Sequence, residues 1–193
     1  MSRIAVMALQ GAFIEHEQML ADLGAESFEI RQLADWQQPK DGLILPGGES
    51  TVQTRLLAEL GLLEPVRQAI IDGLPVFGTC AGLILLAKQE GGQPRKGLCT
   101  MDIDVCRNAY GRQLGSFNAV GEVKGVGSDF PLTFIRAPYV NNTLSSDVEV
   151  ITETDGHIVG VRQGNQLATA YHPEVTADTR LHRYFLEMCS SKN

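Results

Sequence analysis

The stretch PVFGTCAGLILLAK, residues 75–88, decides the fold class of this chain. Pro75–Thr79 is a short apolar run that predicts a buried strand, and Ala81–Lys88 predicts a helix directly after it. The joint between them, GTCAG, has the form G-x-C-x-G, the cysteine counterpart of the G-x-S-x-G turn from a strand into a helix. So sharp a turn pushes its central side chain out of the sheet. The stretch therefore predicts an α/β protein that presents Cys80 at this turn.

The surroundings of Cys80 favour a nucleophile. The amino end of a helix carries positive partial charge, which favours the thiolate form of a cysteine placed there. The backbone amide of Ala81 is left free at the same helix end and can donate a hydrogen bond to an oxyanion. A single cysteine is more often a packing residue, but strand, glycines and helix agree here. We therefore predict that Cys80 is a catalytic nucleophile.

The order strand then helix also describes the residues before this turn. The predicted strands are Ile4–Leu9, Ser27–Ile30 and Gly42–Leu45, and the predicted helices are Phe13–Leu23 and Leu62–Asp72. Repetition of this order is typical of a mostly parallel central sheet with helices on both faces.

The second half of the chain is richer in strands. Strand-like runs occur at Ser116–Val126, Leu132–Ala137 and Val148–Thr154, and Ile158–Arg162 and Leu167–Tyr171 flank the turn sequence Gly164-Asn165. Thr179–Cys189 predicts a final helix. The strand-like runs of this half predict an antiparallel extension of the central sheet. Since no repeat or linker divides the sequence, we expect residues 1–193 to form a single domain.

The composition argues against several classes of function, among them nucleic-acid binding and membrane association. The 193 residues carry 16 basic and 23 acidic side chains, a net charge of −7, which disfavours nucleic acid or an anionic membrane as the main partner. No apolar run approaches the ~20 residues that span a bilayer, and the start of the chain lacks the pattern of a signal peptide. The four cysteines show no metal-binding spacing and indicate reduced thiols. We expect a cytoplasmic protein without a metal site.

His172-Pro173-Glu174 supplies the base that a cysteine nucleophile needs. The imidazole of His172 can take the thiol proton, and the Glu174 carboxylate can orient the ring and stabilise its charged form. Alone, H-P-E most often marks a surface turn, but it gains weight beside the cysteine turn.

The other histidines compete poorly for the role of the base. We expect His16 to be solvated in a polar part of its helix, His157 to lie in a turn, and His182 to lie on the polar side of the last helix.

The segment LPGGES, residues 45–50, joins the third predicted strand to a helix that begins at Glu49 or Ser50. Two adjacent glycines let backbone amides approach a ligand closely. The segment therefore predicts a second oxyanion donor, the amide of Gly48, although the same residues also suit an ordinary turn.

These motifs, P-G-G, G-x-C-x-G and H-P-E in this order, resemble those of the class I glutamine amidotransferases. Further stretches resemble the branch of this family that serves as glutaminase subunit of pyridoxal 5′-phosphate synthase. They are LQG at 9–11, LPGGES at 45–50, GTCAGL at 78–83, RNAYGRQ at 107–113 and IRAP at 135–138. Tyr110 and Tyr171 stand where phenylalanine is frequent in the family.

The resemblance implies a three-layer, flavodoxin-like α/β fold, L-glutamine as the substrate and no cofactor. It implies that Cys80 forms a glutamyl thioester, with His172 as base and acid and Glu174 orienting it. The residues implied in glutamine binding are Gly48, Glu49, Ser50, Arg107, Ile135 and Arg136, with Gly48 and Ala81 as oxyanion donors. Arg107 and Arg136 suit the carboxylate of the substrate, or they shape the pocket through structural pairing.

The resemblance also implies that the ammonia passes to a separate synthase subunit in a hetero-oligomeric complex. Gln10, at the end of the first predicted strand, is the candidate contact with that partner.

Three alternatives stay open. The chain could serve as the glutaminase of another biosynthetic pathway. It could be a cysteine hydrolase of γ-glutamyl or peptide bonds with the same triad. A regulatory module without activity is the third alternative, and the intact triad argues against it.

Overall fold

The computed structural model describes residues 1–107 and 115–191. Its core is a run of parallel strands in the order β2-β1-β3-β4-β13. These strands are β1 (Arg3–Met7), β2 (Glu26–Ile30), β3 (Gly42–Leu45), β4 (Val76–Thr79) and β13 (Gln166–Thr169). Every residue of β3, β4 and β13 is buried, which explains their continuous apolar character. The order 2-1-3-4-5 is that of a flavodoxin-like sheet.

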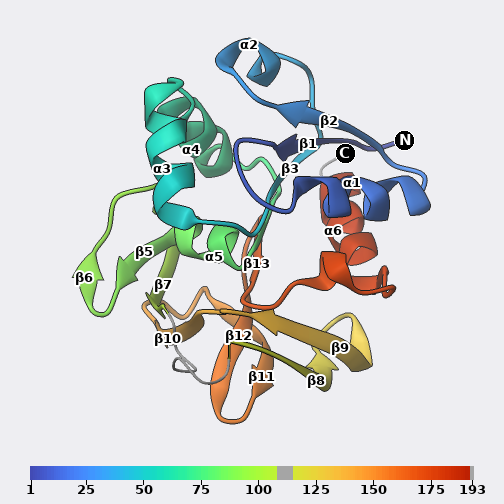
Figure 1. Ribbon diagram of the computed structural model, residues 1–193, viewed down its shortest axis with the longest axis vertical. Coiled ribbons are helices and arrows are strands. Elements are labelled where there is room, and N and C mark those ends of the chain that lie inside the picture. The colour runs from blue at the N-terminus through green and yellow to red at the C-terminus, as the bar shows by residue number, and fades with distance from the viewer. Residues whose placement is uncertain (108–114, 192–193) are drawn as a thin grey trace.

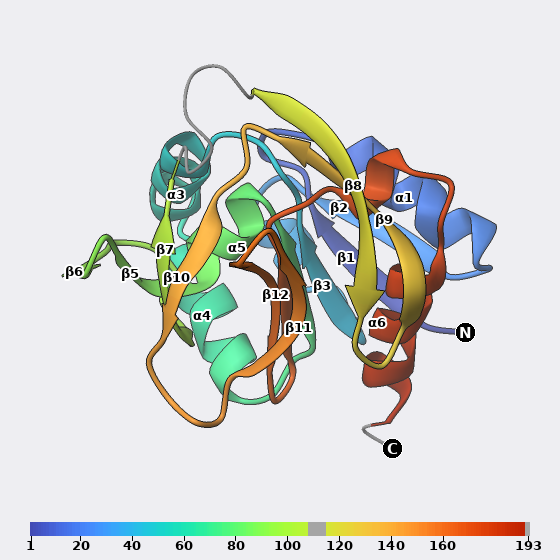
Figure 2. The same cartoon turned by 90° about the horizontal axis from the view of Figure 1, so that it is seen from below.

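Helices cover both faces of these parallel strands (Figures 1 and 2). One face carries α1 (Phe13–Asp22) and α6 (Arg180–Ser190), and the other carries α3 (Ser50–Glu59), α4 (Leu63–Ile71) and α5 (Ala81–Leu86). A single turn of helix, α2 (Leu33–Trp36), lies beside β2. The predicted three-layer α/β fold is confirmed. Over the described residues, no helix has the length and apolar character needed to span a membrane.

The sheet continues beyond β13 as the predicted extension, in which most neighbours are antiparallel. It comprises β12 (His157–Gln163), β10 (Tyr139–Thr143), β7 (Met101–Cys106), β5 (Ala87–Glu90) and β6 (Gln93–Pro94), with β11 (Glu149–Thr154) paired to β12. The β12–β13 hairpin agrees with the Gly164-Asn165 signal. The runs predicted at 116–126 and 132–137 do not join this extension: they fall in a separate two-stranded sheet of β8 (Ser116–Val123) and β9 (Gly127–Ile135), which pair with each other.

The helix expected at Ala81–Lys88 is shorter than predicted. It ends at Leu86, and Ala87 is extended and begins β5, which pairs with β7. The carbonyls of Leu85 and Leu86 accept bonds from the amides of residues 98–100 rather than continuing the helix. Strands β7 and β10, which the sequence analysis did not predict, depend on the same long-range pairing.

The parallel strands bring four loops to one edge of the sheet. Residues 8–12 follow β1, residues 46–49 follow β3, Cys80 follows β4, and residues 170–175 follow β13 and include the 3-10 turn η1 (Pro173–Val175). In open α/β sheets, ligands bind at the carboxyl ends of the strands. The fold therefore gathers the predicted motifs at the edge where a ligand site is expected.

Candidate active site

Cys80 lies at the sharp turn between β4 and α5. Its φ of 51° is in the left-handed region, which costs free energy for a residue with a side chain and is typical of a nucleophile held in a strained turn. The Cys80 amide donates a 2.7 Å hydrogen bond to the Thr169 carbonyl, which ties the turn to β13. A Cβ atom at Gly82 would lie 2.1 Å from the Leu45 carbonyl oxygen, so glycine is required where α5 packs against β3.

His172 and Glu174 lie directly beyond β13, and both are buried. The His172 amide donates a 2.8 Å bond to the Thr133 carbonyl of β9, which fixes the backbone. The ring Nδ1 lies 2.6 Å from Glu174 Oε1, so the carboxylate holds the imidazole in one orientation. The other ring nitrogen, Nε2, is then left for the thiol of Cys80.

The pKa of His172 reflects two opposing effects. Burial lowers the pKa of the imidazole, but hydrogen bonds and charge attraction to Cys80 and Glu174 outweigh burial and raise the pKa to about 10. The site therefore favours the imidazolium form beside the sulfur, and an imidazolium can donate a proton to a leaving amine.

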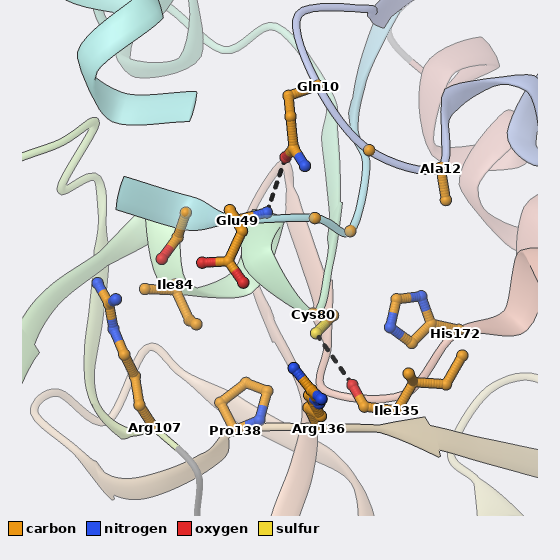
Figure 3. Close-up of a pocket in the computed structure, with 14 residues that line it drawn as sticks. Gln10, Ala12, Glu49, Cys80, Ile84, Arg107, Ile135, Arg136, Pro138 and His172 are labelled. Carbon is orange, nitrogen blue, oxygen red and sulfur yellow. Dashed lines mark hydrogen bonds between the residues drawn. The ribbon is translucent and has the colours of Figure 1, made fainter. Parts of the chain in front are cut away.

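Cys80 and His172 line a cavity of about 570 Å³ (Figure 3). Figure 3 shows Cys80 and His172 facing the same space, which Arg136 also borders. The predicted site residues among those that line the cavity are Gln10, Gly48, Glu49, Ser50, Cys80, Arg107, Ile135, Arg136 and His172. Ala81 and Glu174 do not line it: Ala81 begins α5 behind the sulfur, and Glu174 lies behind His172.

The Gly47–Gly48 peptide is held by the turn after β1. The Ala12 amide donates a 3.0 Å bond to the Gly47 carbonyl, and the Glu49 amide donates a 2.7 Å bond to Gln10 Oε1. In a trans peptide the Gly48 N–H points opposite to the Gly47 carbonyl, and is thus directed away from Ala12. The position of this peptide therefore depends on residues 10–12.

Two arginines border the cavity in different ways. Arg107 Nε lies 2.6 Å from Glu90 Oε1, and its Nη1 donates a 3.2 Å bond to Thr51 Oγ1. Arg136 follows β9 with φ of 46°, another left-handed residue at the site. Residues 108–113 of the RNAYGRQ motif lie outside the described residues.

The carbonyl of Ile135 completes this side of the site. Its oxygen lies 4.0 Å from Cys80 Sγ, so the end of β9 borders the sulfur (Figure 3).

Five further residues that line the cavity were not predicted as site residues: Gly11, Ala12, Gly47, Ile84 and Pro138. Gly47 had a signal in the P-G-G motif, because a Cβ atom there would lie 2.3 Å from His172 Cε1. Ile84 had none, since its position depends on how α5 packs.

The expectations for His16 and His182 are wrong. Both side chains are fully buried, and their rings lie against each other. Helical spacing explains the error: His16 lies on the face of α1 that buries Met19 and Leu20, and His182 lies on the face of α6 that buries Phe185. Their polar neighbours in the sequence point elsewhere.

The comparison with protein families agrees with this geometry. The model of the SNO glutamine amidotransferase family matches residues 6–191. The chain belongs to this family.

Relatives within the family match over nearly the whole chain. A protein of Methanocorpusculum labreanum named pyridoxal 5′-phosphate synthase subunit PdxT is 56% identical over 192 residues, covering 99% of this chain and 100% of the relative. A protein of the same name from Streptococcus pneumoniae strain CGSP14 is 53% identical and covers 98% of both chains. A solved structure described as a glutamine amidotransferase superposes with a TM-score of 0.90 at 46% identity, covering 97% of this chain and 98% of that chain.

Proposed function

We propose that this chain is the glutaminase subunit of a pyridoxal 5′-phosphate synthase, releasing ammonia from L-glutamine for a synthase subunit. One observation carries the proposal: Cys80, in a strained strand-to-helix turn, shares a cavity with a His172 ring that Glu174 holds from behind. The relatives are named as a subunit of pyridoxal 5′-phosphate synthase, which supports this pathway and the presence of a further subunit.

The reaction follows from the triad. The Cys80 thiolate attacks the side-chain amide carbon of glutamine, and the C=O electrons move to the oxygen as an oxyanion. The oxyanion collapses, the C–N bond breaks, and protonated His172 donates a proton to the nitrogen, which leaves as ammonia. A water molecule then attacks the glutamyl thioester while His172 takes its proton. The C–S bond breaks, and glutamate leaves. Glu174 keeps the ring oriented in both half-reactions.

The cavity wall binds the substrate in this proposal. Gly48 and Ala81 donate backbone amides to the oxyanion, Ala81 from the first residue of α5, where an amide has no acceptor within its own helix. Glutamine lies against the wall formed by Gly48, Glu49, Ser50, Arg107, Ile135 and Arg136. Because Arg107 is already paired with Glu90, we assign the substrate carboxylate chiefly to Arg136.

The proposed enzyme is a single domain without a cofactor, in the cytoplasm and in contact with a synthase. Residues 1–193 act as one glutaminase domain, and the chemistry needs no cofactor. The four cysteines are free thiols, which suits a reducing cytoplasm. Gln10 is positioned to transmit contact with the synthase, because its side chain holds the Glu49 amide beside the cavity.

The test measures glutamate and ammonia released from glutamine by the chain mixed with its synthase. Cys80→Ala abolishes hydrolysis while the synthase still makes product from added ammonium salt. Wild-type-like turnover in that variant would remove Cys80 from the mechanism. If the wild type cleaves γ-glutamyl peptides instead, it is a different cysteine hydrolase. If ammonia is released but this synthase makes no product from it, the chain serves another pathway.

A further inference from the structure

Behind the triad lies a pair of histidines that the proposed mechanism does not use. His16 comes from α1 and His182 from α6, two helices on the same face of the sheet (Figure 1). His16 Nδ1 lies 2.8 Å from His182 Nε2, and His16 Nε2 lies 3.1 Å from Thr79 Oγ1, next to Cys80 in sequence. The same His16 Nε2 lies 3.6 Å from Glu174 Oε2. The pair thus links two helices to the back of the triad.

The Glu174 carboxylate explains why this contact matters. Its Oε1 atom accepts from His172, but among the described residues Oε2 has no hydrogen-bond partner, although the side chain is fully buried. A buried carboxylate oxygen without a donor is costly, so a polar hydrogen close to it stabilises the carboxylate in its orientation toward His172. His16 Nε2 is the nitrogen that faces this oxygen.

The protons of the two histidines can be assigned from their partners. Burial is the main reason that the pKa of His16 lies well below its usual value, and the neighbouring His182 and His172 lower this pKa further. Burial also lowers the pKa of His182, to about 4. Each ring is therefore neutral at pH 7 and carries one N–H. In the described structure His182 Nδ1 has no partner, so a proton there would be a buried unsatisfied donor.

The favoured arrangement follows from that cost. His182 carries its proton on Nε2 and donates it to His16 Nδ1. His16 then carries its proton on Nε2, which can donate to Thr79 Oγ1 at 3.1 Å, and Glu174 Oε2 lies 3.6 Å from the same nitrogen, beyond hydrogen-bond distance. Both donors are aligned toward the triad.

We propose that His16 is a positioning residue for Glu174, and that His182 fixes the His16 tautomer that makes it a donor. The N–H of His16 lies 3.6 Å from the free carboxylate oxygen, and the electrostatic attraction between them keeps the carboxylate oriented on His172. The ring reaches substrate only through Glu174 and His172. This inference rests on the proposed glutaminase activity.

The experiment compares His16→Leu with His16→Gln in the complex with the synthase. Leucine fills a similar volume without a donor, whereas the amide of glutamine restores an N–H near the position of Nε2. Loss of a neutral donor that lies near the carboxylate without a hydrogen bond to it corresponds to roughly 3–10-fold in rate. We expect kcat to fall by this factor in His16→Leu with KM for glutamine nearly unchanged, and to recover several-fold in His16→Gln. His157→Gln, a histidine outside the cavity, is the matched control and keeps wild-type kcat.

Two further measurements separate positioning from packing. In a Glu174→Gln background, His16→Leu changes kcat less than about twofold, because residues that act as one unit have non-additive effects. Should His16→Leu fail to fold, His182→Gln and His182→Leu replace it: the donor-retaining glutamine keeps kcat, and leucine lowers it.

The outcomes are distinct. Equal kcat for wild type and His16→Leu, equal losses in the leucine and glutamine variants, or full additivity with Glu174→Gln would overturn the inference. Absence of glutamine turnover by the wild-type complex would instead overturn the proposed function, and the inference with it.

Discussion

Replacement of Gly47 by alanine tests whether the position of His172 limits the reaction. Gly47 lies in the loop after β3, and its φ is outside the left-handed region, so alanine is compatible with the backbone there. The added Cβ atom would lie 2.3 Å from His172 Cε1 and 3.0 Å from Nδ1. Glycine is thus required at this position because the imidazole occupies the space of a side chain.

The size of the effect follows from these distances. An ordinary contact to a Cβ atom begins at 3.4 Å, so the difference from 2.3 Å, 1.1 Å, is the shift that the ring and the loop must share. The ring cannot move freely, because Nδ1 is bound to Glu174 at 2.6 Å. Misplacement of a catalytic group by about 1 Å costs on the order of 10²-fold in rate. Overpacking of this kind costs about 1–3 kcal/mol of stability, which leaves a typical domain folded.

The assay is steady-state glutamate release by Gly47→Ala with saturating synthase, together with a thermal melt. The control is Gly115→Ala. A Cβ atom at Gly115 would meet nothing within 4 Å, and the φ of Gly115, like that of Gly47, lies outside the left-handed region. We expect kcat to fall about 10²-fold in Gly47→Ala and to stay unchanged in Gly115→Ala. Alkylation of the Cys80 thiol by iodoacetamide should slow in parallel, since the displaced imidazolium no longer favours the thiolate.

The reasoning is refuted if Gly47→Ala folds and retains wild-type kcat. Such a result would mean that loop and ring relax together without loss of alignment. A variant that is unfolded at the assay temperature would show that the contact supports the fold more than the chemistry.

Two further predictions concern charge. Since the folded-state pKa values of His16 and His182 lie below the unfolded value near 6.5, the unfolded chain binds more protons in acid, and stability falls as pH drops below about 6.5. Each residue contributes roughly 1 kcal/mol per pH unit, down to about pH 4 for His182. Urea unfolding from pH 6 to 5 measures this slope below the range in which His172, with its raised pKa, contributes in the opposite direction. A flat profile between pH 6 and 5 would contradict the prediction. Arg136→Ala should raise KM for glutamine roughly 10–100-fold with little change in kcat, and Arg107→Ala should raise it less because its guanidinium is paired with Glu90; the reverse ranking would contradict the assignment.

The sequence by itself determined the local parts of this protein. The strand, cysteine turn and helix around Cys80 and the strand–helix order of the first half were predicted correctly, apart from the end of α5 at Leu86. Each depends on residues within a few positions of one another: a glycine where two backbones meet, or an apolar period that matches a strand or helix. The candidate triad could be predicted for the same reason, because the geometry of a turn depends on the residues that form it.

Only the tertiary structure decided what these parts meet. The pairing of β4 with β13 brings Cys80 beside His172, and the pairing of β5 with β7 ends α5 early. Burial of His16 and His182 follows from the packing of α1 and α6 on one face of the sheet, which no pattern of neighbouring residues reports. A polar side chain in a helix is exposed or buried according to what packs on its face, and a partner distant in the sequence decides whether that burial is tolerated.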